Sequence, residues 1–180
     1  TITSDVAKGD NSIDVTSNAT YVAVTERSYL TLVSETLWDP VGSTSNRYGG
    51  EFVKVMVKSA ASFTLQGMVR GTYPIADNAR LYAVNFITDA KVSDLTITQT
   101  GPKGTFANIG AGVLVSKAMD CSVSNIIVHS FDGQGVGIAH AIRTSVEGCS
   151  FRDLTDNGVA IGYGVVVGGM SEHTAITGNH

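Results

Sequence analysis

Apolar residues alternate with small or polar ones in short phrases that recur along the second half of the chain. One phrase is a glycine followed by alternating apolar residues, and it returns every 23 residues, at Gly112, Gly135 and Gly158. A second phrase sets one apolar residue between polar neighbours, and its copies centre on Val92, Val123, Val146 and Ile176. An alternation of period two predicts short β-strands. Its return at such a spacing is typical of a solenoid.

Residues 112–134 show the plan of one repeat. They divide into three predicted strands, at 112–115, 121–124 and 126–129. In the first strand Val113 and Val115 face inward and Leu114 faces outward. The corner after the second strand holds residues that tolerate a left-handed backbone, which are Asp94, Asn125, Gly148 and Gly178 in successive repeats. Equivalent strands are expected to stack about 4.8 Å apart with parallel hydrogen bonds. This stacking also aligns Ile97, Val128 and Phe151.

Two insertions break the period. One is the segment 99–110, which precedes the first copy of the glycine phrase. The other lies at 157–163, where two registers stay open: the third copy begins either at Gly158 or at Gly164. Insertions in solenoids fall on one face and shape the binding surface there.

Residues 1–75 alternate without repeating. Strands are predicted there at 12–16, 21–24, 29–34, 51–57 and 62–66, and residues 80–88 are expected to introduce the repeats. We therefore expect a strand-rich N-terminal cap or attachment region at 1–75 and the first coils of a solenoid at 76–180. The last copy stops mid-coil at His180, which indicates a solenoid truncated at its C-terminus.

Charge and composition narrow the function. The net charge is −4 and the 12 Lys and Arg residues are scattered, which argues against nucleic acid and anionic membrane as partners. No apolar stretch is long enough to insert across a membrane. Cys121 and Cys149 fall at different positions of the repeat, so both are expected to be buried thiols. No metal-ligand spacing, phosphate loop or dinucleotide fingerprint occurs, so neither a metal nor a cofactor is expected.

The repeat resembles the right-handed parallel β-helix of the pectin-lyase-like superfamily. The resemblance covers residues 80–180, with three strands in each coil of about 23 residues, an Asn or Gly corner, and Gly-Val-x-Ile first strands. Within that superfamily the chain looks most like phage tailspike or tail-appendage proteins and similar secreted bacterial proteins. The resemblance implies an all-β chain, a homotrimer, a place in the phage tail of a virion or outside the cell, and a bacterial polysaccharide as partner. The superfamily includes lyases, hydrolases and non-catalytic tail proteins, so catalysis stays open.

Three carboxylates lie in the loops that enter the first strand: Asp132, Asp153 and Asp156. Glycosidases need two carboxyl groups at a defined separation, and lyases need a base beside a uronate. In register, Asp132 falls beside Thr155 and Asp156 beside Gly133, so a catalytic pair across two coils is possible. The alternative is ordinary turn chemistry, because Asp-Gly and Asp-Asn-Gly are common turn sequences.

A second polar group leaves the first strand at its other end. His140 and Arg143 occupy the positions that Lys117 and Asp120 hold one coil earlier. Together they form a surface where a sugar acid could bind, or a solvated turn. Tyr163 is a candidate for stacking on a sugar ring.

Two functions follow from these features. The first is a carbohydrate-directed β-helix, part of a tailspike-like protein that binds and possibly depolymerises a bacterial surface polysaccharide as a lyase or glycoside hydrolase. The alternative is a non-enzymatic structural module of a virion appendage or adhesin, bound to sister chains or other virion proteins. Small outward residues of the first strand, Gly137, Ala160 and Val166, favour the alternative, whereas the Asp-rich loops favour the enzyme.

Overall fold

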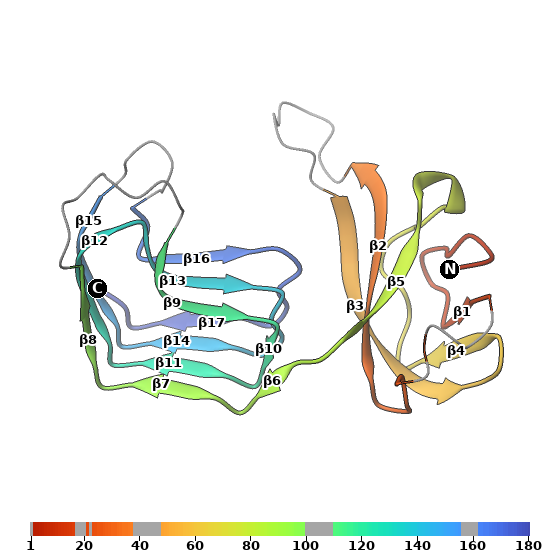
Figure 1. Ribbon diagram of the computed structural model, residues 1–180, viewed down its shortest axis with the longest axis horizontal. Helices are drawn as coiled ribbons and strands as arrows, with labels where there is room; N and C mark the ends of the chain where they lie inside the picture. Colours follow the sequence, from red (N-terminus) through yellow and green to blue (C-terminus); the bar gives the residue numbers. More distant parts are fainter. Residues whose placement is uncertain (1, 17–20, 22, 38–47, 100–109, 156–161) are drawn as a thin grey trace. The chain divides into compact units, whose positions relative to one another are not determined.

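The computed structural model describes residues 2–16, 21, 23–37, 48–99, 110–155 and 162–180, and these are nearly all in strands and the turns between them (Figure 1). The chain forms two compact units, Thr1–Asn85 and Phe86–His180. The short 3-10 helix η2 (Ile75–Asp77) belongs to the first unit. Across the described ranges no helix has the length and apolar character needed to cross a membrane.

The N-terminal unit contains a five-stranded antiparallel sheet. Its order is β1 (Ser12–Asp14), β4 (Ser62–Leu65), β3 (Tyr48–Lys58), β2 (Tyr29–Leu37) and β5 (Arg80–Val84). Alternate residues of these strands point to one face, where Leu30, Leu32, Val53, Val55 and Phe63 form the centre of a buried cluster. Strands were predicted near all of β1 to β4.

One predicted strand is wrong. The described residues Tyr21, Ala23 and Val24 form no strand, and the amide of Val24 donates to the carbonyl of Tyr21 (3.0 Å), as in a tight turn. The ammonium of Lys58 donates to the carbonyl oxygens of Tyr21 and Val24, each at 2.8 Å, and so satisfies both. Burial raises the pKa of Tyr21, whose hydroxyl donates to the carbonyl of Leu81 (3.1 Å).

The β5 strand corrects a second expectation. Residues 80–84 do not introduce the repeats, because β5 pairs with β2 in the N-terminal sheet, with Tyr82 opposite Thr31. The chain passes from one compact unit to the other after Asn85. Alternation alone could not reveal this, because buried Leu81 beside exposed Tyr82 suits either kind of sheet.

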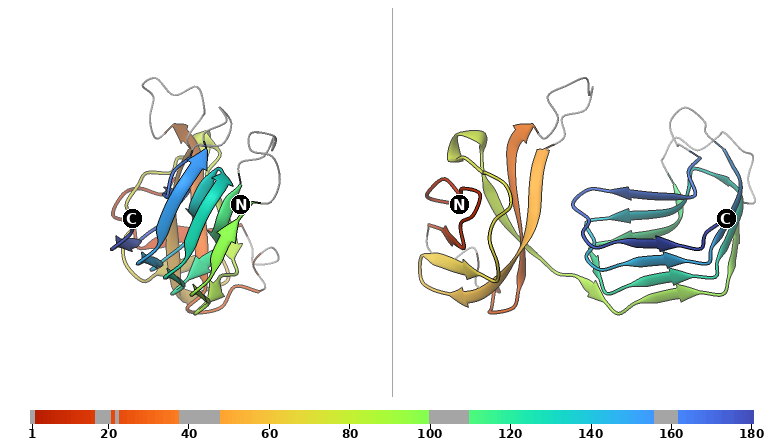
Figure 2. Two further views of the ribbon diagram at one scale, coloured as in Figure 1. Left: turned by 90° about the vertical axis from the view of Figure 1, so that its left-hand side faces the viewer. Right: turned by 180° about the vertical axis from the view of Figure 1, so that it is seen from behind.

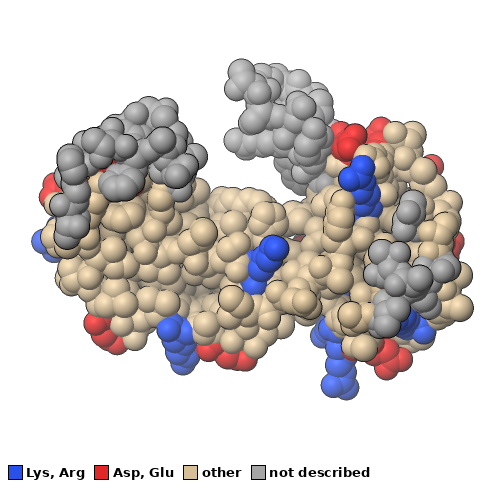
Figure 3. All heavy atoms as spheres, viewed as in Figure 1, with Lys and Arg blue, Asp and Glu red and all other residues tan. Residues whose placement is uncertain are grey.

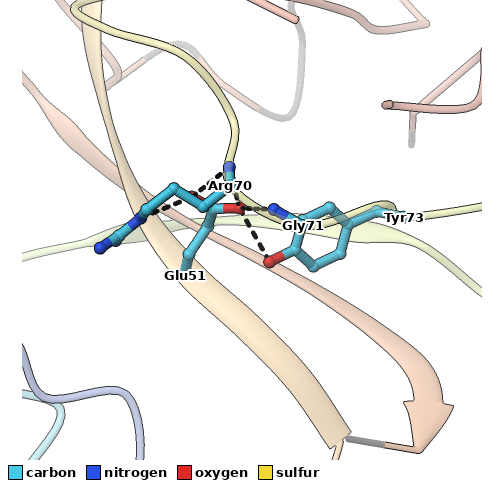
Figure 4. A network of polar contacts seen from close by, with 4 residues as sticks. All are labelled: Glu51, Arg70, Gly71 and Tyr73. Atoms are coloured by element: carbon cyan, nitrogen blue, oxygen red, sulfur yellow. Dashed lines mark hydrogen bonds and ion pairs between the residues drawn. The ribbon is translucent and has the colours of Figure 1, made fainter. Parts of the chain in front are cut away.

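A buried carboxylate fastens a loop to the core side of this sheet (Figure 4). Glu51 is 6% exposed and points to the same side as Val53 and Val55. Its oxygens accept hydrogen bonds from the amides of Arg70 (2.9 and 3.0 Å) and Gly71 (3.0 Å). They also accept from the Tyr73 hydroxyl (3.0 Å) and from Arg70 Nε (3.2 Å). The loop in turn pairs with the N-terminal segment, because Val6 and Tyr73 exchange backbone hydrogen bonds of 3.1 and 2.7 Å.

The C-terminal unit consists of parallel sheets whose strands come from successive repeats (Figures 1 and 2). One sheet stacks β7 (Lys91–Ser93), β11 (Ser122–Ser124), β14 (Ser145–Glu147) and β17 (Ala175–Thr177). A second stacks β8 (Thr96–Thr98), β12 (Ile127–Asp132) and β15 (Ser150–Thr155). A third stacks β9 (Ala111–Ser116), β13 (Gln134–Ala139) and β16 (Val165–Gly168). The short strands β6 (Ile87–Thr88) and β10 (Ala118–Met119) pair between the first two repeats.

The predicted alignment of inward residues is confirmed. Val123 pairs with Val92 and Val146, and Ile176 follows in the next repeat. Val128 likewise pairs with Ile97 and Phe151. The corner residues are left-handed as expected, with φ of 57° at Asp94, 53° at Asn125, 63° at Gly148 and 62° at Gly178. Both cysteines are free and buried, as predicted.

The structure also decides the open register. Val136 pairs with Val165, so the third copy of the first strand follows Gly164, and Gly158–Ile161 lie outside the described residues. In this register Phe151, which pairs with the smaller Val128 of the preceding repeat, packs against two glycines. A Cβ on Gly135 would collide with the Phe151 ring, and one on Gly164 would lie 2.8 Å from it. The Phe151 ring thus packs against Gly135 and Gly164, and neither position has room for a side chain.

Candidate functional site

Apart from Asp153, the described residues that were singled out in the sequence lie near one or the other end of β13 in the stacked repeats. We call the end before β13 the loop corner, formed by Gln99, Asp132, Gly133, Thr155 and Tyr163. We call the end after β13 the polar corner, formed by Lys117, Asp120, His140 and Arg143.

At the loop corner, Asp132 is buried, with 3% of its surface exposed. Its amide donates to Gln99 Oε1 (2.9 Å), and Gln99 Nε2 donates to Asp132 Oδ2 (3.4 Å). The amide side chain of Gln99 therefore contacts both the backbone and the carboxylate of Asp132. Asp132 pairs in register with Thr155, as the sequence predicted.

Close backbone approach shapes this corner. Gly133 has φ of 117°, and a Cβ there would strike the carbonyl oxygen of Gly110. That same oxygen accepts the amide of Gln134 (3.0 Å), and the amide of Gly133 donates to Thr155 (3.3 Å). Only glycine fits at position 133, so the glycine of this Asp-Gly sequence is structurally required whether or not Asp132 takes part in chemistry.

Asp153 differs from Asp132. Asp153 is exposed and lies on a left-handed bend of φ 50° within β15, at the place that Ser130 holds one repeat earlier. One carboxylate is thus buried and the other faces solvent. Asp156 lies outside the described residues, so its predicted place beside Gly133 stays a prediction.

Tyr163 joins the loop corner from the next repeat. Its carbonyl accepts the amide of Gly135 (2.9 Å), which fixes the backbone at the start of β13. Its side chain is 56% exposed. An aromatic ring open to solvent thus stands at the same end of β13 as Asp132.

At the polar corner, Asp120 and Arg143 form a bidentate ion pair between adjacent repeats. Arg143 Nε donates to Asp120 Oδ1 and Nη2 to Oδ2, each at 2.7 Å. These hydrogen bonds hold the pKa of Asp120 below its ordinary value. Since its guanidinium already binds a carboxylate, Arg143 is a poor candidate to neutralise the carboxylate of a sugar acid.

All four residues of the polar corner have a left-handed backbone, with φ between 48° and 57°. The sequence predicted a left-handed backbone only at the corners that hold Gly, Asn or Asp. It did not predict one at Lys117, His140 or Arg143. The His140 ring lies over Gly169 of the next repeat, where a Cβ would approach Cε1 to 3.1 Å. Within the described ranges, no three His, Cys, Asp or Glu side chains converge as a metal-binding group.

The residue that sequence reasoning missed is Gln99. It directly follows β8, at the first residue of the insertion, and nothing in the repeat marks it, because its equivalents are not glutamines. The one sequence signal for Gln99 is the strand register. Because Thr98 pairs with His129, the residue after Thr98 lies near the segment that contains Asp132.

Charged residues are unevenly distributed over the C-terminal unit. The strands β9, β13 and β16 contain none. Figure 3 shows that the charged side chains of this unit, coloured blue and red, lie mostly along the edges of the face in view. Leu114, on β9, is 66% exposed.

No protein-family model matches the chain, and no curated protein matches it. Among solved structures, it is similar to the tailspike protein gp49 from Pseudomonas phage LKA1, with a TM-score of 0.65 and 19% sequence identity. It is also similar to the tailspike gp61 of Pseudomonas phage phi297, with a TM-score of 0.66 and 14% identity. Both matches cover 99% of this chain and 30% of the tailspike.

A third match is the gp54 tailspike of Acinetobacter baumannii bacteriophage AP22, solved in complex with a capsular saccharide of A. baumannii. Its TM-score is 0.47 at 14% identity, over 99% of this chain and 44% of that one. The chain thus spans less than half of each tailspike. At these identities the likeness concerns the fold, which is that of tailspike proteins.

Proposed function

We propose that the chain is part of a phage tailspike-like protein that binds a bacterial surface polysaccharide. In this proposal the C-terminal unit forms the first coils of a right-handed parallel β-helix of the pectin-lyase-like kind. The observation that carries the proposal is that the likeness to two tailspikes extends over 99% of the chain. The likeness therefore includes the antiparallel N-terminal unit as well as the parallel sheets. This matters because stacked parallel sheets alone occur in proteins of many unrelated functions.

The loop corner is the proposed saccharide site. Tyr163 offers an exposed ring on which a sugar can stack. Asp153 offers an exposed carboxylate, and Asp132 a buried one held by Gln99. Asp156 completes the proposed carboxylates. When one carboxyl group is buried and a second is exposed, their different environments can assign one as general acid and the other as nucleophile or base.

The polar corner is proposed to extend the binding surface with Lys117, His140, Arg143 and Asp120. Because Arg143 is bound to Asp120, we place any cleavage at the loop corner and expect hydrolysis rather than elimination. The protein is proposed to act as a homotrimer in a virion tail.

A second function is favoured by one observation. The uncharged strands β9, β13 and β16 and the exposed Leu114 form a surface suited to packing against sister chains. On this alternative the unit is a rigid spacer of a virion appendage or adhesin and binds no sugar.

Incubation with a panel of purified capsular and cell-wall polysaccharides tests the proposal. We expect at least one glycan to bind. New reducing ends without unsaturated products would indicate hydrolysis, and unsaturated products absorbing in the ultraviolet would indicate a lyase. Loss of cleavage in Asp132→Asn and Asp153→Asn, with binding retained, supports the loop corner. Neither binding nor cleavage across the panel would favour the spacer.

A further inference from the structure

The N-terminal sheet has a second face that its core does not use. Leu30, Leu32 and Val53 point to the core. Their neighbours along the strands point the other way. We call this side the aromatic face and define it by Tyr29, Thr31, Phe52, Lys54, Arg80 and Tyr82.

Strand register arranges these residues as a compact group. Thr31 pairs with Phe52 on one side and with Tyr82 on the other, so the three form one row across the sheet. Tyr29 pairs with Lys54 in the next row and is the diagonal neighbour of Tyr82. Side chains in such positions are close enough for one extended ligand to contact several of them.

Burial divides the group into a floor and a rim. Thr31 and Phe52 are buried and form the floor. Tyr82 is 48% exposed, Arg80 is exposed, and Tyr29 and Lys54 are half-buried. The accessible part of the face therefore consists of two tyrosine rings and two cations.

Both cations are bound to aromatic or amide groups. Lys54 Nζ lies 5.7 Å from the centre of the Tyr29 ring. Arg80 Nη1 donates to the Tyr82 hydroxyl (3.4 Å) and Nε to Asn78 Oδ1 (2.9 Å). The carboxylate of Glu35 accepts from Asn78 (2.6 Å). Among the residues that the structure describes, neither Lys54 nor Arg80 forms an ion pair with a carboxylate, and Glu35 acts on Arg80 only at longer range.

We propose that the aromatic face binds a segment of acidic polysaccharide built from uronic acids. The apolar faces of the sugar rings stack on Tyr82 and Tyr29, and the uronate carboxylates pair with Arg80 and Lys54. Aromatic rings provide apolar contact with a polar tip, and a cation without a carboxylate partner gains a charge-assisted hydrogen bond from the ligand. This site is separate from the loop corner, so it does not depend on the proposed function.

A polysaccharide fits better than a nucleic acid. The chain has a net charge of −4, and nucleic-acid binding needs a broad basic surface to neutralise many phosphates. Two cations suit a polymer that carries one charge per sugar ring.

The test is calorimetric titration of the intact chain with a galacturonate hexasaccharide. We expect Tyr82→Ala and Lys54→Gln each to weaken binding by about tenfold. Tyr82→Phe keeps the ring and is expected to bind within about twofold of the original chain. Lys91→Gln removes an exposed cation from β7 of the other unit and is the matched charge control. Circular dichroism of each variant establishes that it is folded.

Several results would overturn the proposal. They are no binding of the hexasaccharide, equal losses for Tyr82→Ala and Lys91→Gln, or tighter binding of a single-stranded oligodeoxythymidylate through the same residues. Tyr163→Ala reports on the loop corner separately. If binding is lost only in Tyr163→Ala, the aromatic face is not the binding site and the proposed function stands. If binding is lost only in Tyr82→Ala, the aromatic face binds the hexasaccharide and the loop corner does not.

Discussion

The N-terminal and C-terminal units hold their backbones together in different ways. In the first, the single carboxylate of Glu51 accepts hydrogen bonds from three residues of one loop, and that loop pairs with the N-terminal segment (Figure 4). In the second, contacts run from each repeat to the next, as between Asn125 and Asp94 or between Arg143 and Asp120. From this difference we expect one substitution to destabilise the whole first unit, and a substitution in the second unit to affect mainly the neighbouring repeats.

The largest effect is expected for Glu51→Ala. It leaves the amides of Arg70 and Gly71 without their acceptor inside the fold, and we expect a loss of about 3–5 kcal/mol in the free energy of unfolding. Glu51→Gln is expected to lose less, because its amide oxygen still accepts. Urea unfolding followed by circular dichroism measures both. The control is Glu147→Ala on β14, an exposed carboxylate in the other unit, and a loss as large as that of Glu51→Ala would contradict the comparison.

The next effect is expected for Gly135→Ala in the C-terminal unit. The new methyl group collides with the Phe151 ring, at a cost of about 2–3 kcal/mol. Adding Phe151→Val, which restores the residue type of Val128, is expected to recover only part of the loss. The remainder persists because the methyl group also lies 2.6 Å from the carbonyl oxygen of Gly164. Thermal unfolding of both single variants and the double variant measures the coupling, and full additivity would show that ring and glycine do not compete for space.

A smaller effect is expected at the corner residue Asn125, whose φ is 53°. Asn125→Ala is expected to cost about 1 kcal/mol, because alanine tolerates a left-handed backbone poorly. Asn125→Gly is expected to cost less, since Gly148 and Gly178 occupy the same corner in later repeats. Denaturant unfolding of the two variants ranks them. Both variants lose the side-chain contact with Asp94, so a glycine variant that is less stable than the alanine variant would contradict the role given to the left-handed backbone.

The smallest effect is expected at the exposed pair of Asp120 and Arg143. The pKa of Asp120 is lowered in the folded chain. The pair therefore stabilises the fold above the ordinary pKa of the carboxyl group, and this contribution is lost as the pH falls through the lowered value. In Arg143→Gln the pKa of Asp120 is expected to rise back toward its ordinary value. A carboxyl NMR titration measures it, and an unchanged pKa would mean that the hydrogen bonds do not form in solution.

Periodicity predicted the C-terminal unit well because each inward position repeats its chemistry. Val92, Val123 and Val146 are the same residue in the same place, and parallel pairing leaves them no other partner. The register of the third repeat stayed open for a physical reason. Glycines at positions 158 and 164 both fit the repeated phrase, and spacing does not encode which of them lies beside Phe151.

The N-terminal unit was less predictable because its contacts join distant segments. Glu51 accepts hydrogen bonds from Arg70 and Tyr73. No local sequence pattern indicates that a carboxylate facing the core has such partners. The same holds for the candidate site. The Asp-Gly turn at Asp132 was visible in the sequence, but the partner Gln99 lies 33 residues away.

The central claim is that the loop corner binds a bacterial saccharide. The most direct measurement is amide NMR of the chain during titration with purified capsular oligosaccharides. The account expects at least one oligosaccharide to shift the amides of Gly133, Gln134 and Tyr163 and to lose that effect in Tyr163→Ala. If no oligosaccharide moves those amides, or if the shifts persist unchanged in Tyr163→Ala, the loop corner is not the binding site.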